Sequence, residues 1–213
     1  VTAAIRNLGT TGGLTTRGSV AVTATESATL TSRARAAAMS GSASAFSVSV
    51  SGGGAGTGDT VTSTTSASIT NSRVTSAGDV AVSASDTTTI DSQVLGISVA
   101  GGLLALAAGG SVAKVEARPT VTAAIEGGSG SAANVSVVAT ALPSVNAVAT
   151  GINAGTAAIG ASVAEAKVAA TVGASTKNVS ITAGSLSVLG NLARQARRDS
   201  ATATVVPLPT KGS

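Results

Sequence analysis

One short stretch recurs four times along the chain, and this repetition constrains the fold more than any other feature. The sequence GDVAVSAS at 78–85 has close relatives at 18–25 (GSVAVTAT), 133–140 (ANVSVVAT) and 184–190 (GSLSVLG). Counted from the first Val or Leu of each copy, the spacings are 60, 55 and 51 residues. Recurrence at a spacing of tens of residues is typical of solenoids, in which each repeat buries its apolar face against its neighbour.

Each copy alternates apolar residues with small or polar ones. Val80, Val82 and Ala84 share one side of an extended chain, and small residues occupy the other. A period of two with β-branched enrichment predicts β-strands rather than helices. The residues predicted to face inward are Val20, Val22, Val80, Val82, Val135, Val137, Leu186 and Val188.

Other elements keep the same order around this strand. VTAAI occurs at 1–5 and again at 121–125, and a Thr-rich strand follows the repeated stretch, as at 87–92. We predict an all-β chain forming an elongated β-solenoid, a right-handed parallel β-helix of imperfect repeats. At about 20 residues per coil, each unit would hold two to three coils, and about ten coils would give a rod on the order of 50 Å long.

The predicted boundaries follow the imperfect repeats. The solenoid region is 1–205, and a C-terminal linker or tail is 206–213. The units are placed at roughly 1–65, 66–120, 121–167 and 168–205.

Composition favours a thin core and disfavours catalysis. The 213 residues include no His, Cys, Trp or Tyr and a single Phe, although 43% are hydrophobic. Charged residues make up 10%, against about 25% in an average domain. The lack of Cys excludes a disulfide framework and a thiolate metal site. Small and β-branched side chains can fill only a narrow interior.

The acidic residues are the remaining candidates for general acid–base chemistry. Glycoside hydrolysis needs two carboxylates that face one bond, and the nearest groupings are Asp79 with Asp86 and Asp91, and Glu116 with Glu126. Neither grouping has a His or an aromatic platform, so we interpret them as solvated residues near turns. We therefore predict no enzyme, no catalytic residue, no cofactor and no metal site. The nine acidic residues are Glu26, Asp59, Asp79, Asp86, Asp91, Glu116, Glu126, Glu165 and Asp199.

The uncharged stretch 94–113 is long enough to cross a membrane as a helix. Its SVA motif recurs at 162–164 within a polar segment, which argues against a membrane span. We predict two fully buried strands joined by a turn at Gly101–Gly102, and a short helix packed on the solenoid is the alternative.

The glycine-rich stretch 52–61 lacks the Lys of a phosphate loop, and Asp59 does not match the spacing of a calcium-binding nonapeptide. We predict a flexible inserted loop there.

Repeated Thr-x-Thr pairs are typical of ice-binding ladders, but the third unit has Ser, Asn and Val where Thr would be needed. Basic residues are scattered apart from Arg33/Arg35 and Arg194/Arg197/Arg198, without aromatic stacking, so we predict no nucleic-acid partner. The Thr pairs are Thr23/Thr25, Thr29/Thr31, Thr60/Thr62, Thr62/Thr64, Thr87/Thr89 and Thr202/Thr204.

The succession GDVAVSAS…TTTIDS…LGISVAGGLLALAAGGSVAKVEARPTVTAAIEGG at 78–128 resembles the repeats of very large bacterial filamentous adhesins. These are the leukotoxin-type and filamentous-haemagglutinin-like exoproteins secreted through an outer-membrane partner. Their units combine a TVTAxI strand, a VTAGGDVxVxA strand and a GGxxAxGxSVAVN segment, and the resemblance extends from Val1 to about Leu192. It implies an extracellular stalk without catalytic residues.

We therefore expect a structural stalk segment of a large secreted or surface-exposed bacterial adhesin, which extends a binding tip from the cell in adhesion and biofilm formation. The alternative is a binding module whose solenoid face recognises a glycan, ice or another copy of itself. The expected partners are neighbouring repeats of the same polypeptide, the outer-membrane secretion partner and a host or surface receptor. Self-association is expected head to tail or laterally. Head-to-tail contact should involve the Val1 end, because the Arg-rich end carries better protection for its strand edges.

Overall fold

The computed structural model describes residues 1–9, 12–41, 48–102 and 104–206, and these contain eleven strands and no helix. All strand pairings are parallel, so the predicted all-β solenoid is confirmed. Residues 207–213 of the predicted tail lie outside the described residues. The strands are β1 (Thr2–Arg6), β2 (Leu14–Thr16), β3 (Val20–Gly41), β4 (Val48–Ser76), β5 (Val80–Gly101), β6 (Leu104–Ala141), β7 (Ser144–Ala154), β8 (Ala157–Val168), β9 (Thr171–Lys177), β10 (Ser180–Leu192) and β11 (Gln195–Val206).

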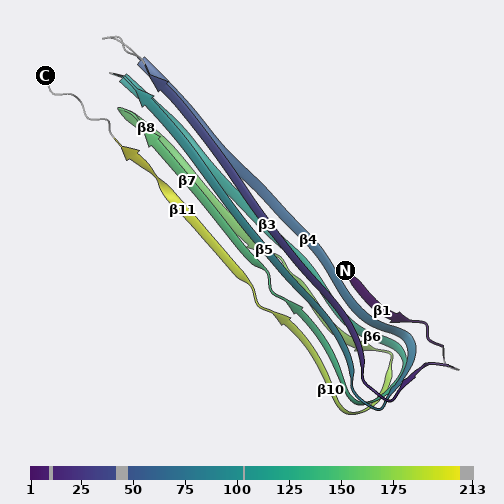
Figure 1. Cartoon of the computed structure of the whole chain (residues 1–213). Helices are drawn as coiled ribbons and strands as arrows, with labels where there is room; N and C mark the ends of the chain where they lie inside the picture. The colour runs from purple at the N-terminus through teal and green to yellow at the C-terminus, as the bar shows by residue number, and fades with distance from the viewer. Residues whose placement is uncertain (10–11, 42–47, 103, 207–213) are drawn as a thin grey trace.

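Each coil consists of two long legs that run in opposite directions (Figure 1). We call the end near the turn at residues 77–79 the base and the opposite end the far end. The outgoing leg runs from the base to the far end, and the return leg runs back. The outgoing legs are β3, β5, the end of β6 with β7, and β10 with β11. The return legs are β4, the start of β6, and β8 with β9.

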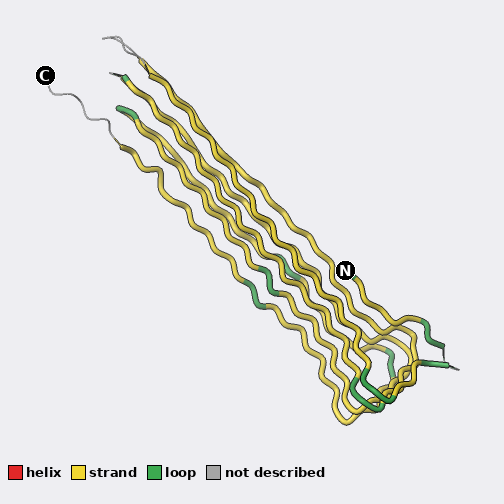
Figure 2. The backbone as a smooth tube through the Cα atoms, viewed as in Figure 1, coloured by secondary structure: helices red, strands yellow, loops and turns green. Residues whose placement is uncertain are grey.

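One sequence unit forms one coil. Val20 lies beside Val80, Val80 beside Val135, and Val135 beside Leu186. The expectation of two to three short coils per unit is therefore wrong. β5 alone has 22 residues, about 70 Å at roughly 3.3 Å per residue, whereas four stacked layers span only about 14 Å. The long axis consequently follows the strands and not the stack (Figure 2).

The unequal repeat spacings arise mainly at the far end. Gly41 is the register partner of Gly101, and Val48 is that of Leu104, so the first connection is four residues longer than the second. In the third coil Ala154 pairs with Val99 and Ala157 pairs with Leu106. The connection at the far end of the third coil is therefore four residues shorter than that of the second. At the base the offset between the second and third layers changes by one residue, from 56 at Thr75 and Ser131 to 55 at Val80 and Val135.

The base has a short third side, which begins at a corner repeated in each coil. Three corner residues are Asn and one is Gly, and all have positive φ, between 47° and 68°. Asn and Gly are the residues that adopt the left-handed conformation at least cost. The corner follows register-matched residues at the ends of the return legs. The corner residues are Asn7, Asn71, Gly127 and Asn178.

The interior between the legs is narrow and divides into three apolar clusters along the long axis. Six of the eight residues predicted to face inward are no more than 9% exposed, as expected. Leu186 and Val188 are 51% and 41% exposed, so their predicted burial is wrong. They occupy the correct columns, and among the described strands β10 pairs with β6 on one side only.

The two legs approach most closely in the far half of the molecule. A Cβ on Gly96 of β5 would lie 2.8 Å from the carbonyl oxygen of Gly110 in β6, and one on Gly53 of β4 would lie 2.9 Å from that of Ile97. Inward glycines therefore let the opposing backbones meet. Residues 52–61 belong to β4, so the predicted flexible loop is wrong, and Gly53 is the glycine among them that a close opposing backbone requires.

The stretch 94–113 forms parts of β5 and β6 around Gly101–Gly102, which confirms the predicted strands and rules out the helical alternative for its described residues. Within the part of the chain that the structure describes, no helix is long and apolar enough to span a membrane. The prediction of full burial is wrong, because Leu104 and Leu106 are 62% and 39% exposed. Both point outward from the return leg.

Candidate functional site

A cluster of charged side chains crosses the outward face of the return legs, and we call it the charged belt. Lys114 of β6 is the register partner of Glu165 of β8, and Glu116 is the partner of Lys167. The nitrogen–oxygen distances are 3.7 Å and 2.9 Å respectively. Arg118 donates to Glu116 at 2.8 Å. The belt consists of Lys114, Glu116, Arg118, Glu165 and Lys167.

Glu116 is the electrostatic centre of the belt. The hydrogen bond from Arg118, together with that from Lys167, lowers the pKa of Glu116 to about 2. The same bond raises the pKa of Arg118. A shallow groove of about 400 Å³ lies beside these groups, with Gly58 and Thr60 on its β4 side. The glycine leaves room there because it has no side chain.

An apolar surface adjoins the belt on the side of the far end, and we call it the apolar patch. Its residues occupy outward positions on three neighbouring strands, β4, β6 and β8, and are 38% to 70% exposed. Outward glycines of β4 keep the adjoining surface flat. A contiguous exposed apolar surface is typical of an interaction site. The patch consists of Val48, Val50, Leu104, Leu106, Val112, Ile159 and Val163.

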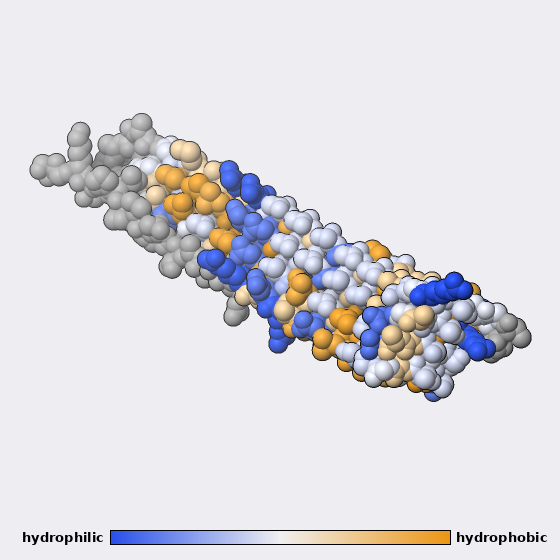
Figure 3. Space-filling view, turned by 60° about the horizontal axis from the view of Figure 1, so that its bottom comes forward, coloured by the Kyte–Doolittle hydropathy of each residue, from blue (hydrophilic) through white to orange (hydrophobic). Residues whose placement is uncertain are grey.

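The space-filling view shows how hydropathy varies over one face of the molecule. On the face in Figure 3, apolar residues gather toward one end of the molecule, and a band of hydrophilic residues crosses it beside them. The central and basal parts of that face are mostly of intermediate hydropathy.

Two carboxylates point into the interior near the base. Glu26 and Asp86 are register partners on adjacent outgoing legs. Asp86 is completely buried and accepts hydrogen bonds from Ser63 and Thr88, both at 2.7 Å. Glu26 accepts a 3.0 Å bond from Thr65 and lies 3.6 Å from the amino terminus. Hydroxyl donors from the opposing leg therefore hold both carboxylates, which tie the two legs together.

The first predicted carboxylate grouping is not formed. Asp79 lies in the base turn and accepts a bond from Asn134, Asp86 points inward, and Asp91 points outward and accepts a bond from Asn146. Asp86 and Asp91 are five residues apart on one strand, and an odd separation places side chains on opposite faces. Asp86 and Asp91 lie within β5, so the interpretation that they lie near turns is wrong, and Asp86 is also buried rather than solvated.

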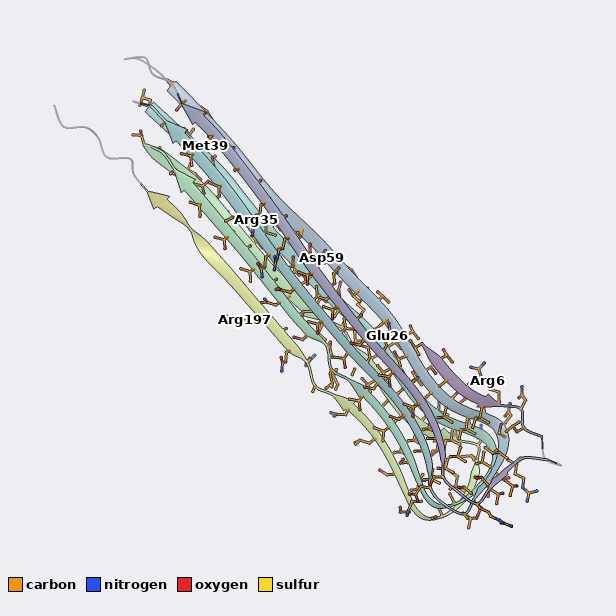
Figure 4. All side chains as sticks on the ribbon, in the orientation of Figure 1. Arg6, Glu26, Arg35, Met39, Asp59 and Arg197 are labelled. Carbon is orange, nitrogen blue, oxygen red and sulfur yellow. The ribbon has the colours of Figure 1, made fainter. Side chains whose placement is uncertain are left out.

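The second predicted grouping is also separated. Glu116 and Glu126 lie on β6, ten residues and roughly 33 Å apart along the strand. Glu116 is mid-strand, whereas Glu126 precedes the bend at Gly127–Gly128. Asp59 occupies an inward column of β4, farther from the base than Glu26 (Figure 4). Among the described residues, no group of three acidic side chains could hold a metal ion.

The Thr pairs and the basic pairs are distributed over several surfaces. Outward Thr side chains occupy both the outgoing and the return faces, and the column of Thr31 continues as Asp91 and Asn146. Arg33 and Arg35 lie on β3, the first outgoing layer, while Arg194 and Arg197 lie at the last layer. Neither set forms one continuous stripe.

The belt and the patch were missed by reasoning from single motifs. A signal for the belt nevertheless exists in the sequence. Lys114 and Glu165 are 51 residues apart, as are Glu116 and Lys167, and 51 is also the spacing between the last two copies of the repeated strand. A comparison of the chain with protein-family models, curated proteins and solved structures found no match in any of the three.

Proposed function

We propose that the chain is a structural segment of a large secreted or surface-exposed bacterial adhesin, in which stacked coils form a stalk that carries a binding tip. The observation that supports this most is the common register of the four repeated strands. Each coil presents the next with the same columns of inward Val, Ile and Ala side chains. A chain built in this way extends by adding coils rather than by adding domains.

The long coil changes what such a stalk would look like. Each coil uses 51 to 60 residues to advance one strand spacing, about 4.8 Å. The proposed stalk is therefore a broad blade, roughly 70 Å wide along its strands, rather than a thin rod. Its stiffness comes from continuous backbone hydrogen bonding between coils, and its two broad faces provide surface for contacts.

The test of this proposal uses a longer chain in which residues 20–185 occur twice in tandem. Stacking should increase the dimension along the coil axis by about 14 Å for three added coils, with the strand-direction length unchanged. Small-angle scattering and electron microscopy would measure both dimensions. Two separately tumbling bodies, or growth along the strand direction, would contradict the proposal.

A second candidate function is a binding module, which the exposed apolar patch and the charged belt favour. The two functions differ in what the isolated chain does. Binding to a glycan array or inhibition of ice recrystallisation by the chain, abolished by Ile159→Asp, would favour the module. A stalk segment should show neither activity, while the tandem chain still stacks.

A further inference from the structure

The charges of the belt alternate in two directions. Along β6, Lys114 is followed on the same face by Glu116, and along β8, Glu165 is followed by Lys167. Across the strands, Lys114 lies beside Glu165 and Glu116 beside Lys167. Four side chains thus form a two-by-two arrangement in which every neighbour has the opposite charge. When β6 of one copy faces β8 of a second copy, each charge of this arrangement therefore meets an opposite charge.

We propose that the charged belt and the part of the apolar patch on β6 and β8 form a docking face for a second copy of this chain. The two copies are related by a two-fold axis that lies parallel to the strands, between β6 and β8. This operation places β6 of one copy opposite β8 of the other and keeps positions along the strands aligned. The contact is isologous, because each copy contributes the same residues.

This axis matches charge with opposite charge. Lys114 of one copy faces Glu165 of the other, and Glu116 faces Lys167. The same operation places apolar residues together, so that Val112 of one copy faces Val163 of the other. Ile159 faces the register position of Ala108. The belt therefore aligns the copies while the patch supplies the apolar burial that drives association.

Other registers are unfavourable for the same charges. An axis that runs along β6 itself would place Lys114 on Lys114 and Glu116 on Glu116 of the second copy. Like charges brought together at an interface lower affinity and exclude that arrangement. The belt consequently disfavours that axis, which the flat apolar patch alone would allow.

The size of the face indicates a weak dimer. β8 pairs with the twelve residues Leu106–Ala117 of β6, so the paired region is roughly 40 Å by 10 Å from strand geometry. That is about 400 Å² per copy, below the roughly 800 Å² typical of stable complexes. We therefore expect a dissociation constant of roughly 10–500 μM, weaker than that of stable complexes. This pairing is lateral and requires only the outward face, so it stands or fails independently of the proposed stalk.

Charge reversal tests the pairing. Sedimentation velocity from about 1 to 500 μM would measure dimerisation of the wild-type chain, Lys114→Glu, Glu165→Lys and the double variant. Each single variant should weaken dimerisation at least tenfold, because it places like charges together, and the double variant should restore it to within about threefold. Lys177→Glu, on β9 outside the face, is the matched control and should leave dimerisation unchanged.

Cysteine cross-linking tests the register without altering a charge, and the native chain contains no Cys. Val112→Cys chains and Val163→Cys chains would be oxidised separately and as a mixture. The mixture should form disulfide-linked dimers several times faster than either variant alone, since residue 112 faces residue 163 of the other copy. Circular dichroism would establish that each variant is folded.

Several results would overturn the proposal. They are a wild-type chain that stays monomeric at 500 μM, a double charge reversal that fails to restore dimerisation, and cross-linking that is fastest between identical Val112→Cys chains. Association that survives Ile159→Asp would also contradict it, because that contact would not use the apolar patch.

Discussion

Replacing Gly96 by Ala should destabilise the protein. This substitution tests whether the inward faces of the two legs of a coil pack directly against each other. Gly96 is buried in β5 and faces the return leg. An added Cβ would lie 2.8 Å from the carbonyl oxygen of Gly110 and 2.8 Å from the hydroxyl oxygen of Ser111. One of these contacts is with backbone, so a side-chain rotation cannot relieve it.

The expected magnitude follows from two opposing effects. Inserting a methyl group into a well-packed interior costs about 1–3 kcal/mol. Reducing the freedom of the unfolded chain by replacing Gly with Ala returns about 0.4–1 kcal/mol. The net loss in the free energy of unfolding for Gly96→Ala should therefore be roughly 1–2 kcal/mol.

Gly58→Ala is the matched control. Gly58 points outward from β4, and a Cβ there meets no atom within 4 Å. Only the unfolded-state effect remains, so this variant should be unchanged or more stable by up to about 1 kcal/mol. The two variants should differ by about 1–3 kcal/mol, and each kcal/mol corresponds to roughly 2–4 °C in melting temperature for a domain of this size.

Thermal and urea unfolding followed by circular dichroism near 218 nm would measure this difference. The wild-type chain and both variants should share one far-ultraviolet spectrum before unfolding. Equal stability of Gly96→Ala and Gly58→Ala would refute the reasoning, because it would mean that no backbone opposes Gly96. Short coils of about 20 residues would give that result.

Four further expectations follow from the same structure. Val82→Ala should lower the free energy of unfolding by about 2 kcal/mol through lost burial and a cavity, whereas Val188→Ala in the same column should have little effect in urea unfolding because Val188 is 41% exposed. Asp86→Ala should cost about 1–3 kcal/mol, since Ser63 and Thr88 lose their acceptor; unchanged stability would contradict this. The pKa of Glu116 is lowered to about 2 from an ordinary value of 4.5. Its ionised carboxylate therefore stabilises the fold above pH 4.5, and this stabilisation is lost as the pH falls from 4.5 toward 2. Thermal unfolding of Glu116→Gln, measured over this pH range, should lack that part of the pH dependence. Head-to-tail association through the Val1 end should weaken in a variant with Thr2→Lys and Ala4→Lys, measured by light scattering over a wide concentration range, and association unaffected by it would contradict that expectation.

The order of the elements could be predicted from the sequence because recurrence and alternation are both local patterns. The two VTAAI copies at 1–5 and 121–125 occupy the same columns, linked through Ser66 and its neighbours in β4. Val20, Val80 and Val135 likewise share one column. A strand can be recognised from the alternation of its own residues, and the alignment of neighbouring strands can be recognised from a motif that occurs in each of them.

The length of a coil was not predictable from the same patterns. Changes in composition along β5, from Thr-rich to Gly- and Ala-rich, were interpreted as separate short strands. The strand in fact continues for 22 residues, because composition reflects what lies opposite each segment. The Gly- and Ala-rich part faces a close backbone, as the contacts of Gly96 with Gly110 indicate. Such a contact joins two legs and leaves no signal in either leg alone.

Glycine gave the most misleading signal for this reason. In most sequences a run such as residues 52–58 indicates a turn. In β4 the inward Gly53 is required by the carbonyl oxygen of Ile97, while the outward glycines have open space or ordinary contacts around them. Only the first of these is a packing requirement, and the sequence alone does not distinguish it from the others.

In this fold the burial of an inward side chain depends on the coils stacked beside it as well as on the residue itself. Val82, Val137 and Val188 occupy one column with the same alternation around them, and sequence reasoning assigned all of them to the interior. The first two are completely buried and the third is 41% exposed, although nothing in its own segment differs in kind. Within the part of the chain that the structure describes, a coil stacks on each side of Val82 and Val137 and removes their methyl groups from water, whereas a coil stacks on one side of Val188. The apolar pattern therefore specifies a column, and the neighbouring coil determines how much free energy that column contributes.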